Sequence, residues 1–418
     1  MPSSRITELA TLVQANTAKV DKYLQENNLP FPSFDEEGPV DFKIESDEIQ
    51  NARTAAMEAS LELHDLLLGP SMCLRPVLNG TSLQTIYKYD IPAKVPLNGE
   101  ISFPELAAKC ELYEPDLRRI LRFAMVYHRV FQERNVGYVA HTAASRRLVE
   151  DANAMDALGS QFDEAWQAFA HTVEAMDKFK SHDPTKTGWT VAQKTDQPMW
   201  AYYASHPSMA KRFAGAMATF ADGPSISPSL LAKGYPWSSV ENGAGTIVDV
   251  GGSKGNISVA LAQSVPGLRF IVQDLPGAMQ GAKDTVPSEI VSRIEFMEHD
   301  FFQDQSIKAD AFLFRMIFHN WSDEYVIKIL KATVPGLKPG GRIIVNDYLV
   351  PEPKTMSLIK ERTIREMDMI MLSLFNSRDR EEKEWVTLFG QADARYTNVK
   401  AWVPTGSSLA IIEATWSG

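Results

Sequence analysis

The sequence has little of what disulfide-stabilised, membrane-spanning or nucleic-acid-binding proteins depend on. Only two cysteines occur among 418 residues, so no disulfide framework is expected, and a reducing, cytoplasmic compartment fits best. Acidic residues outnumber basic ones by 53 to 42, for a net charge of -11, which argues against nucleic acid or an anionic membrane as a partner. There is no run of 18 apolar residues and no apolar segment of signal-peptide length near the start, so neither a membrane span nor a secretory signal is predicted.

Length and apolar patterning predict four regions. A chain of 418 residues is expected to form two domains or one large one. Residues 1–50 read as an amphipathic helix, which packs on a partner subunit or on the protein body, followed by a polar linker. Residues 51–152 read as a mostly helical domain, and residues 153–235 as a helical connector in which residues 199–220 form one strongly amphipathic stretch. Residues 236–418 read as a domain of alternating strands and helices.

Residues 101–140 have the order of elements of a winged helix. Ser102 is placed to cap a first short helix, a second helix begins near Glu114, and residues 131–140 read as a hairpin wing. Three arginines on the second helix would suit DNA, but neighbouring acids offset their charge. We therefore interpret this domain as a dimerisation scaffold, which predicts a homodimer and no nucleic-acid partner.

Short apolar runs from residue 243 onward predict a parallel sheet. Helical patterns separate the runs at residues 246–250, 269–273, 294–298, 311–315 and 342–347, and Lys338-Pro-Gly-Gly341 predicts a turn before the fifth run. Two further runs, at residues 399–403 and 408–415, predict a terminal hairpin that adds an antiparallel strand. The expected fold class is α/β, with a doubly wound Rossmann-like sheet and a mostly helical winged-helix domain before it.

The glycine-rich turn after the first run indicates the cofactor. Asp249 precedes Gly251-Gly252-Ser253-Lys254-Gly255, and Asp274 ends the second run about 20 residues later, where a carboxylate can hold a ribose. The turn departs from the G-x-G-x-x-G pattern that binds a pyrophosphate, and an acid before it suits a cationic ligand. We therefore predict S-adenosylmethionine (SAM), which carries an ammonium and a sulfonium and no phosphate. The alternative is an ordinary glycine turn in an α/β domain.

His319 is the candidate catalytic residue. It lies just past the fourth strand, at the edge where doubly wound sheets bind ligands. Asp347 ends the next strand and Asp379 lies in a later loop, so both are placed to orient the imidazole and raise its basicity. The free ring nitrogen would then take a proton from a substrate hydroxyl. The alternative for each residue is a structural or solvated side chain. No Asp/His cluster in the sequence has metal-ligand spacing, so no metal is predicted.

In combination, these motifs resemble those of fungal class I SAM-dependent O-methyltransferases, which are related to the plant caffeate and flavonoid enzymes. The resemblance covers nearly all of residues 60–418, including the winged-helix domain, and implies a homodimer. It also implies S-adenosylhomocysteine as a product and a small aromatic or polyketide substrate methylated at a phenol or enol. It implies that His319 is the general base and that Asp347 and Asp379 flank it. The cofactor-binding positions that it implies are Asp249, Gly251, Gly252, Gly255, Asp274, Leu275, Asp300, Phe301 and Arg315, with Asp300 and Phe301 at the adenine. The substrate-binding positions are His141, Phe213, Met217, Trp321, Met371, Phe375 and Asn376. The alternative for His141 is a polar contact within the wing.

Two other functions stay open at this stage. Some fungal proteins that resemble this family are pericyclases, which dehydrate or cyclise polyketide-derived substrates with SAM bound and transfer no methyl group. The SAM loop does not separate the two readings because both bind SAM, whereas an intact His319 with two acids favours methyl transfer. The sequence departs from many relatives at Asn320, where they have Asp, and plant relatives often have Glu at the flanking acids. The least favoured function, a DNA-binding regulator that senses SAM, rests on the winged helix alone.

Overall fold

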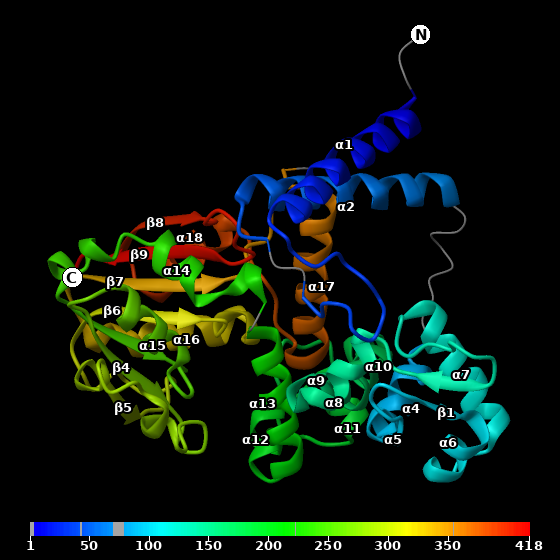
Figure 1. Cartoon of the computed structure of the whole chain (residues 1–418). Coiled ribbons are helices and arrows are strands. Elements are labelled where there is room, and N and C mark those ends of the chain that lie inside the picture. The colour runs from blue at the N-terminus through cyan, green and yellow to red at the C-terminus, as the bar shows by residue number, and fades with distance from the viewer. Residues whose placement is uncertain (1–3, 42–43, 70–78, 222, 354) are drawn as a thin grey trace. The chain divides into compact units, whose positions relative to one another are not determined.

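The computed structural model describes residues 4–41, 44–69, 79–221, 223–353 and 355–418 (Figure 1). These residues divide into two compact units, Met1–Glu164 with Ser208–Thr219, and Ala165–Pro207 with Phe220–Gly418. The boundaries of these two units differ from those of the four regions expected from the sequence, and the division into four regions stays a prediction. None of the described helices is long and apolar enough to cross a membrane.

The first unit begins with two long helices, α1 (Arg5–Glu26) and α2 (Asp47–Leu68), which pack against each other (Figure 1). Within α1 only Leu9 and Leu24 are buried, whereas Ile6 and Leu12 are 43% and 45% exposed. The N-terminal helix therefore lies on another helix of its own chain and leaves apolar side chains in solvent.

The elements of the expected winged helix are present in the predicted order. Strand β1 (Glu100–Ser102) leads into α6 (Phe103–Cys110), where the N–H of Glu105 donates to Ser102 Oγ at 3.3 Å. Helix α7 (Glu114–Tyr127) follows, and β2 (Tyr138–Ala140) pairs antiparallel with β1. The expected hairpin is reduced to a single bridge between Gln132 and Ala140. The remaining helices that begin in this unit are α4 (Thr81–Lys88), α5 (Ile91–Lys94), α8 (Ala143–Glu150), α9 (Ala152–Ser160) and the π-helix η1 (Gln161–Ala165).

The arginines of α7 lie among acidic residues. Each one forms an ion pair with a nearby acid, the pairs being Arg118–Glu114, Arg119–Asp116 and Arg122–Glu133. The acids offset the charge of the arginines, and the expectation that the domain does not read DNA stays a prediction.

Helices connect the two units along the chain. Residues 199–220, expected as one amphipathic stretch, form two helices, α12 (Met199–Ala204) and α13 (Pro207–Ala221). The break precedes Pro207, since proline has no N–H to donate and disfavours helical geometry in the residue before it. The other helices before the sheet are α10 (Trp166–Phe179), α11 (Gly188–Gln193), η2 (Pro224–Ile226), α14 (Pro228–Gly234), η3 (Trp237–Ser239) and η4 (Glu241–Gly243).

The second unit is built on a seven-stranded sheet with the order β5-β4-β3-β6-β7-β9-β8 (Figure 1). The strands are β3 (Thr246–Val250), β4 (Arg269–Asp274), β5 (Ile294–Glu298), β6 (Ala309–Arg315), β7 (Leu337–Asp347), β8 (Tyr396–Trp402) and β9 (Ala410–Trp416). The first five are parallel, and β9 pairs antiparallel with both β7 and β8. The predicted fold class and the terminal hairpin are thus confirmed. One correction concerns residues 338–341, expected as a turn, which lie inside β7 beside a register shift.

Helices cover both faces of this sheet. Along β6, Phe312 and Phe314 pack on one face with residues of α16 (Asp323–Thr333) and α18 (Glu382–Ala392). Ala311 and Leu313 pack on the other face with α14 and α15 (Asn256–Ser264), as the two-residue period of a strand requires. The remaining elements are η5 (Ala282–Thr285), η6 (Val291–Arg293), η7 (Phe318–Asn320), η8 (Val334–Gly336) and α17 (Leu358–Phe375).

Candidate active site

The turn after β3 is fixed to the end of β4. The N–H groups of Gly251 and Gly252 both donate to the carbonyl oxygen of Gln273, at 2.8 and 3.2 Å. Gly251 and Gly255 have φ angles of +72° and +76°, which an L-residue with a side chain rarely adopts. These contacts bring the glycines next to Asp274, as the motif predicts.

Asp274 lies partly exposed at the end of β4. One carboxylate oxygen accepts the N–H of Ser253 at 2.8 Å and the other accepts the N–H of Leu275 at 2.7 Å. Burial raises the pKa of Asp274, and the two backbone hydrogen bonds act against that rise. Each oxygen keeps a second lone pair, so the carboxylate is held in place with acceptor capacity for a sugar hydroxyl. The side chain of Leu275 beside it is 55% exposed.

Asp249 lies behind the turn. It is 2% exposed, and Ser258 Oγ donates to its Oδ2 at 2.7 Å. Burial raises the pKa of Asp249 to about 6. A β-carbon on Gly252 would lie 2.7 Å from Asp249 Cγ, so the glycine and the carboxylate fit each other closely. The structure therefore gives Asp249 a part in shaping the turn and its electrostatic field.

An aromatic cluster stands after β5 and β6. The ring centroids of Phe301 and Phe302 lie 5.9 and 4.8 Å from that of Trp321, and Tyr325 lies 5.6 Å from Trp321. Asp300 is exposed, and its Oδ1 accepts the N–H of Phe302 at 3.0 Å. Trp321, expected at the substrate, thus lies with Phe301, expected at the adenine.

Arg315 ends β6 in a partly buried position. Its guanidinium donates to the side-chain oxygen of Asn346 and to the carbonyl oxygen of Ile226. Burial lowers the pKa of Arg315, while the charges of Asp249 and Asp347 act in the opposite direction. The arginine therefore interacts electrostatically with one acid from each of the two predicted sites.

The tertiary structure brings together the three predicted catalytic residues. His319 Nδ1 lies 3.4 Å from Asp347 Oδ1 and 3.6 Å from Asp379 Oδ1. These are ion-pair separations, and Nδ1 makes no well-formed hydrogen bond within the described residues. The backbone N–H of His319 donates to Asp347 Oδ2 at 3.1 Å, so Asp347 holds the residue by its backbone as well. All three are at least 95% buried.

The two acids decide the electrostatics of the ring. Burial lowers the pKa of His319, but the carboxylates of Asp347 and Asp379 outweigh it, so the net pKa is raised. Burial also raises the pKa of Asp347 to about 6. One ring nitrogen of His319 and one carboxylate oxygen of each acid, the atoms that could bind a metal ion, lie within 4.8 Å of one another. The spacing along the sequence did not reveal this grouping. The expectation that no metal is required stays a prediction.

Sequence reasoning missed Arg380, which directly follows Asp379. It is 1% exposed, and its guanidinium donates to the carbonyl oxygens of Phe318 and Trp321 on either side of His319, at 3.0 and 2.6 Å. Its position beside a candidate acid was the only signal in the sequence, and its partners come from a segment about 60 residues away.

The predicted substrate-binding residues fall into different environments. Met371 and Phe375 are buried at the C-terminal end of α17, where Phe375 stacks on Trp200 at a centroid distance of 5.5 Å. Asn376 donates from its amide to carbonyl oxygens of residues 181–186, so its amide group fixes that loop. Phe213 and Met217 lie on α13, where Met217 is 39% exposed.

His141 is engaged inside the first unit. It is fully buried, with Nδ1 at 3.0 Å from Ser145 Oγ and Nε2 at 3.1 Å from the carbonyl oxygen of Val95. Both ring nitrogens already have protein partners, so neither is available to contact a small molecule. The interpretation of His141 as a structural residue of the wing is the one that fits.

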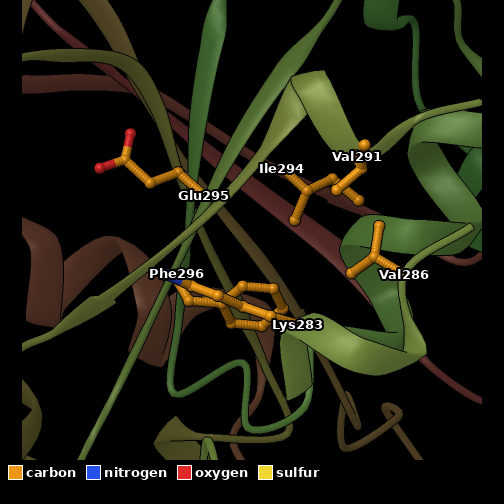
Figure 2. Close-up of a pocket in the computed structure, with 6 residues that line it drawn as sticks. All are labelled: Lys283, Val286, Val291, Ile294, Glu295 and Phe296. Atoms are coloured by element: carbon orange, nitrogen blue, oxygen red, sulfur yellow. The ribbon is translucent and has the colours of Figure 1, made fainter. Parts of the chain in front are cut away.

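An open cavity of about 230 Å³ lies elsewhere, along the edge strand β5. Figure 2 shows the apolar side chains of Ile294, Val286 and Val291 together, while the carboxylate of Glu295 points away from them. None of its lining residues belongs to the predicted cofactor, catalytic or substrate sets.

Comparison with known sequences identifies the family. Residues 191–395 match the model of the O-methyltransferase domain. The grayanic acid biosynthesis cluster O-methyltransferase of Cladonia grayi is 51% identical over 415 residues, which cover 99% of this chain and 88% of that protein. The chain belongs to the O-methyltransferase family. O-methyltransferase pyvH of Aspergillus violaceofuscus is 49% identical over 426 residues, with both chains covered completely.

Solved structures of low identity share the fold of this O-methyltransferase. OxaC in complex with SAH and oxaline has a TM-score of 0.74 at 22% identity, covering 98% of this chain and 100% of that one. A structure described as a pericyclic reaction enzyme has a TM-score of 0.71 at 20% identity, covering 97% and 100%. The predicted family, the SAM cofactor and methyl transfer to oxygen are confirmed by the family membership. The protein is accordingly an enzyme related to those of fungal secondary metabolism.

Proposed function

We propose that this O-methyltransferase methylates a phenol or enol hydroxyl of a small aromatic or polyketide metabolite, with His319 as the general base. The observation that carries the proposal is the approach of two carboxylates to one nitrogen of a buried imidazole, at 3.4 and 3.6 Å from Nδ1. Because Nδ1 faces the acids, Nε2 on the opposite side of the ring is the nitrogen left for a substrate hydroxyl. The relatives in Cladonia and Aspergillus support a secondary metabolite as the substrate class.

The residues around the turn after β3 fit SAM. Asp274 has two fixed oxygens at the strand end, and an exposed Leu275 stands beside them. We assign Gly251, Gly252 and Gly255 to the backbone that approaches the ligand, and Asp249 with Arg315 to the charge behind it. Asp300, Phe301 and Trp321 would hold the adenine, and this grouping moves Trp321 from the substrate set. When bound, SAM supplies an electrophilic methyl group.

Catalysis would depend on proton removal and on alignment. His319 accepts the proton of the substrate hydroxyl as the oxygen attacks, and Asp347 and Asp379 stabilise the resulting imidazolium. Hydrogen-bond distances between catalytic groups are often long in a ligand-free site and shorten when the substrate is bound. Phe375 and Met371, with Trp200 stacked on Phe375, are proposed to line the aromatic substrate. Phe213 and Met217 stay predictions from the family resemblance alone, and His141 and the amide of Asn376 are left out.

The expected homodimer is part of the proposal. Helices α1 and α2 bury few apolar side chains, and Ile6, Leu12 and Leu67 are 43%, 45% and 66% exposed. A second copy of the chain would cover such a surface. A cytoplasmic location is proposed on the low cysteine content alone.

The pericyclase is the second candidate, favoured by the shared fold with a pericyclic reaction enzyme. Product mass distinguishes the two functions. The protein and SAM are incubated with panels of phenols and polyketide-derived enols, and the products are analysed by mass spectrometry. A product heavier by one methylene unit, formed in step with S-adenosylhomocysteine, is expected. A product of unchanged mass, or one lighter by water, with SAM intact would indicate the pericyclase instead.

The role of His319 is tested by His319→Ala. This variant should lose methyl transfer and keep SAM affinity within about twofold of the parent, since the side chain acts on the hydroxyl substrate. Full turnover by His319→Ala would show that another group removes the proton.

A further inference from the structure

Four hydrogen bonds connect the buried guanidinium of Arg380 to its surroundings. Nη1 donates to the carbonyl oxygens of Phe318 and Arg378 at 3.0 and 3.2 Å, and Nη2 donates to that of Trp321 at 2.6 Å. Nε donates to Asp323 Oδ1 at 2.9 Å. The side chain therefore spans the start and the end of the short 3₁₀ segment that contains His319.

The loop that carries Arg380 is fixed on its other sides too. The N–H of Asp379 donates to Asp368 Oδ1 at 2.9 Å, and the carbonyl oxygen of Arg380 accepts the N–H of Val350 at 2.9 Å. Ser377 Oγ donates to the carbonyl oxygen of His319. By contrast, neither carboxylate oxygen of Asp379 has a hydrogen-bond partner among the described residues. The distance between Asp379 and the imidazole is thus set by how this loop is held against the 3₁₀ segment.

We propose that Arg380 is a positioning residue for the general base, which it aligns with Asp347 and Asp379 by holding the backbone on both sides of His319. The inference rests on the proposed role of His319. Only arginine offers five N–H donors in a planar fork, whereas a lysine ammonium is a single point that cannot reach both carbonyl groups and Asp323 together. Arg380→Lys is therefore not a conservative change at this site.

The charge of Arg380 acts on the same imidazole. The groups that face His319 are Asp347 from β7, Asp379 and Arg380 from the loop before α18, and Tyr348, whose ring centroid lies 6.4 Å from that of His319. The acids raise the pKa of His319 and Arg380 lowers it. Without the arginine charge the pKa of His319 rises further, so less neutral base is present at a given pH. Loss of the charge of Arg380 should therefore shift the pKa of His319, whereas loss of its hydrogen bonds alone should not.

Arg378 provides a matched control. It pairs with the same acid, Asp323, at 2.7 Å and with Glu384 at 2.6 Å. Its side chain is 46% exposed, whereas that of Arg380 is 1% exposed, and it donates to Asp323 Oδ2, the oxygen that Arg380 does not use. Arg378→Met removes a positive charge beside the same acid, while the guanidinium of Arg380 still donates to the carbonyl groups around His319.

The test compares Arg380→Met, Arg380→Lys, Arg378→Met and His319→Ala in turnover of a phenol that the mass screen shows to be converted. Both Arg380 variants should lose about 100-fold in kcat, the size expected for a misplaced catalytic group, with the KM for the phenol and the Kd for SAM near parental values. The rising limb of kcat against pH should move to higher pH in Arg380→Met and stay in place in Arg380→Lys, which keeps the charge. Arg378→Met should change kcat by no more than about twofold and should leave the rising limb of kcat against pH in place.

A second measurement does not need a substrate. The ring protons of His319 are followed by NMR against pH, with the signal assigned by its absence from His319→Ala, and Arg380→Met should shift the titration upward. If Arg380→Met fails to fold, Arg380→Lys decides by its kcat alone. The positioning role would be overturned if kcat of the Arg380 variants fell no more than that of Arg378→Met and the titration of His319 did not move. In that case an inactive His319→Ala would still support His319 as the base. An active His319→Ala would instead overturn the proposed base, and the role of Arg380 with it.

Discussion

Replacing Asp249 by asparagine should make the ligand-free protein more stable at neutral pH. The carboxyl group is 2% exposed on β3 and receives a hydrogen bond from Ser258. An ionised carboxylate in this place has lost most of its hydration, and burial raises its pKa from 3.8 to about 6. Asparagine has almost the same shape without the charge, and the hydroxyl of Ser258 can bond to its amide group.

The size and the pH range of the effect follow from the shift. Because the folded pKa of Asp249 lies above the unfolded one, the stability that this group contributes is fully present below pH 3.8 and is lost as pH rises to about 6. At 1.36 kcal/mol per pKa unit, the loss amounts to about 3 kcal/mol at pH 7.5 and about half of that at pH 5. Asp249→Asn should exceed the parent in free energy of unfolding by these amounts.

Urea unfolding of both proteins without SAM, at pH 5, 6 and 7.5, measures the difference. Other groups that titrate in this range, such as Asp347, are common to both proteins and cancel. Asp310 on β6 is the control, because it is 7% exposed but pairs with Lys338 at 2.8 Å and accepts the N–H of Thr246 at 2.7 Å. Asp310→Asn should therefore lower stability, by about 1 kcal/mol. A pH-independent difference, or a less stable Asp249→Asn at pH 7.5, would refute the reasoning.

The same substitution should cost function. If the buried charge serves a cationic ligand, Asp249→Asn binds SAM more weakly, by about tenfold for the loss of roughly 1.4 kcal/mol of attraction. Calorimetric titration of SAM into both proteins measures this. A variant that is more stable and binds SAM as tightly as the parent would leave the charge of Asp249 without a role at the cofactor.

Three further substitutions test the site and its frame. Asp274→Ala should weaken SAM binding at least tenfold in the same titration, and an unchanged Kd would remove the ribose assignment. Gly251→Ala should lower the free energy of unfolding by about 1–2 kcal/mol because of its φ of +72° and of Ile317 Cδ1 at 2.5 Å from the added β-carbon, which denaturant unfolding would reveal. Gly390→Ala in α18, where no atom lies within 4 Å of the added β-carbon, should instead stabilise the protein by about 0.5–1 kcal/mol, and a loss of stability would contradict that open position.

Local patterns of the sequence were sufficient for the strands of the large sheet. Alternation and short apolar runs predicted all strands of the large sheet, and turn glycines predicted the link between β3 and α15, because these features depend on residues near one another along the chain. The failures were local as well. Residues 338–341 look like a turn yet continue β7, and Pro207 divides a stretch whose apolar pattern is continuous.

The sequence by itself determined which strand ends carry chemistry, since parallel strands in a doubly wound sheet place their carboxyl ends on one edge. It named His319 and Asp347 on that ground, and Asp379 only as a possible second acid. The tertiary structure alone decided that both acids approach the same ring nitrogen and that Arg380 holds the backbone around it. It also decided that His141 and the amide of Asn376 are occupied by their own surroundings. Such pairings join residues that are distant along the chain, and they form only when packing brings the loops together, so no local pattern of residues encodes them.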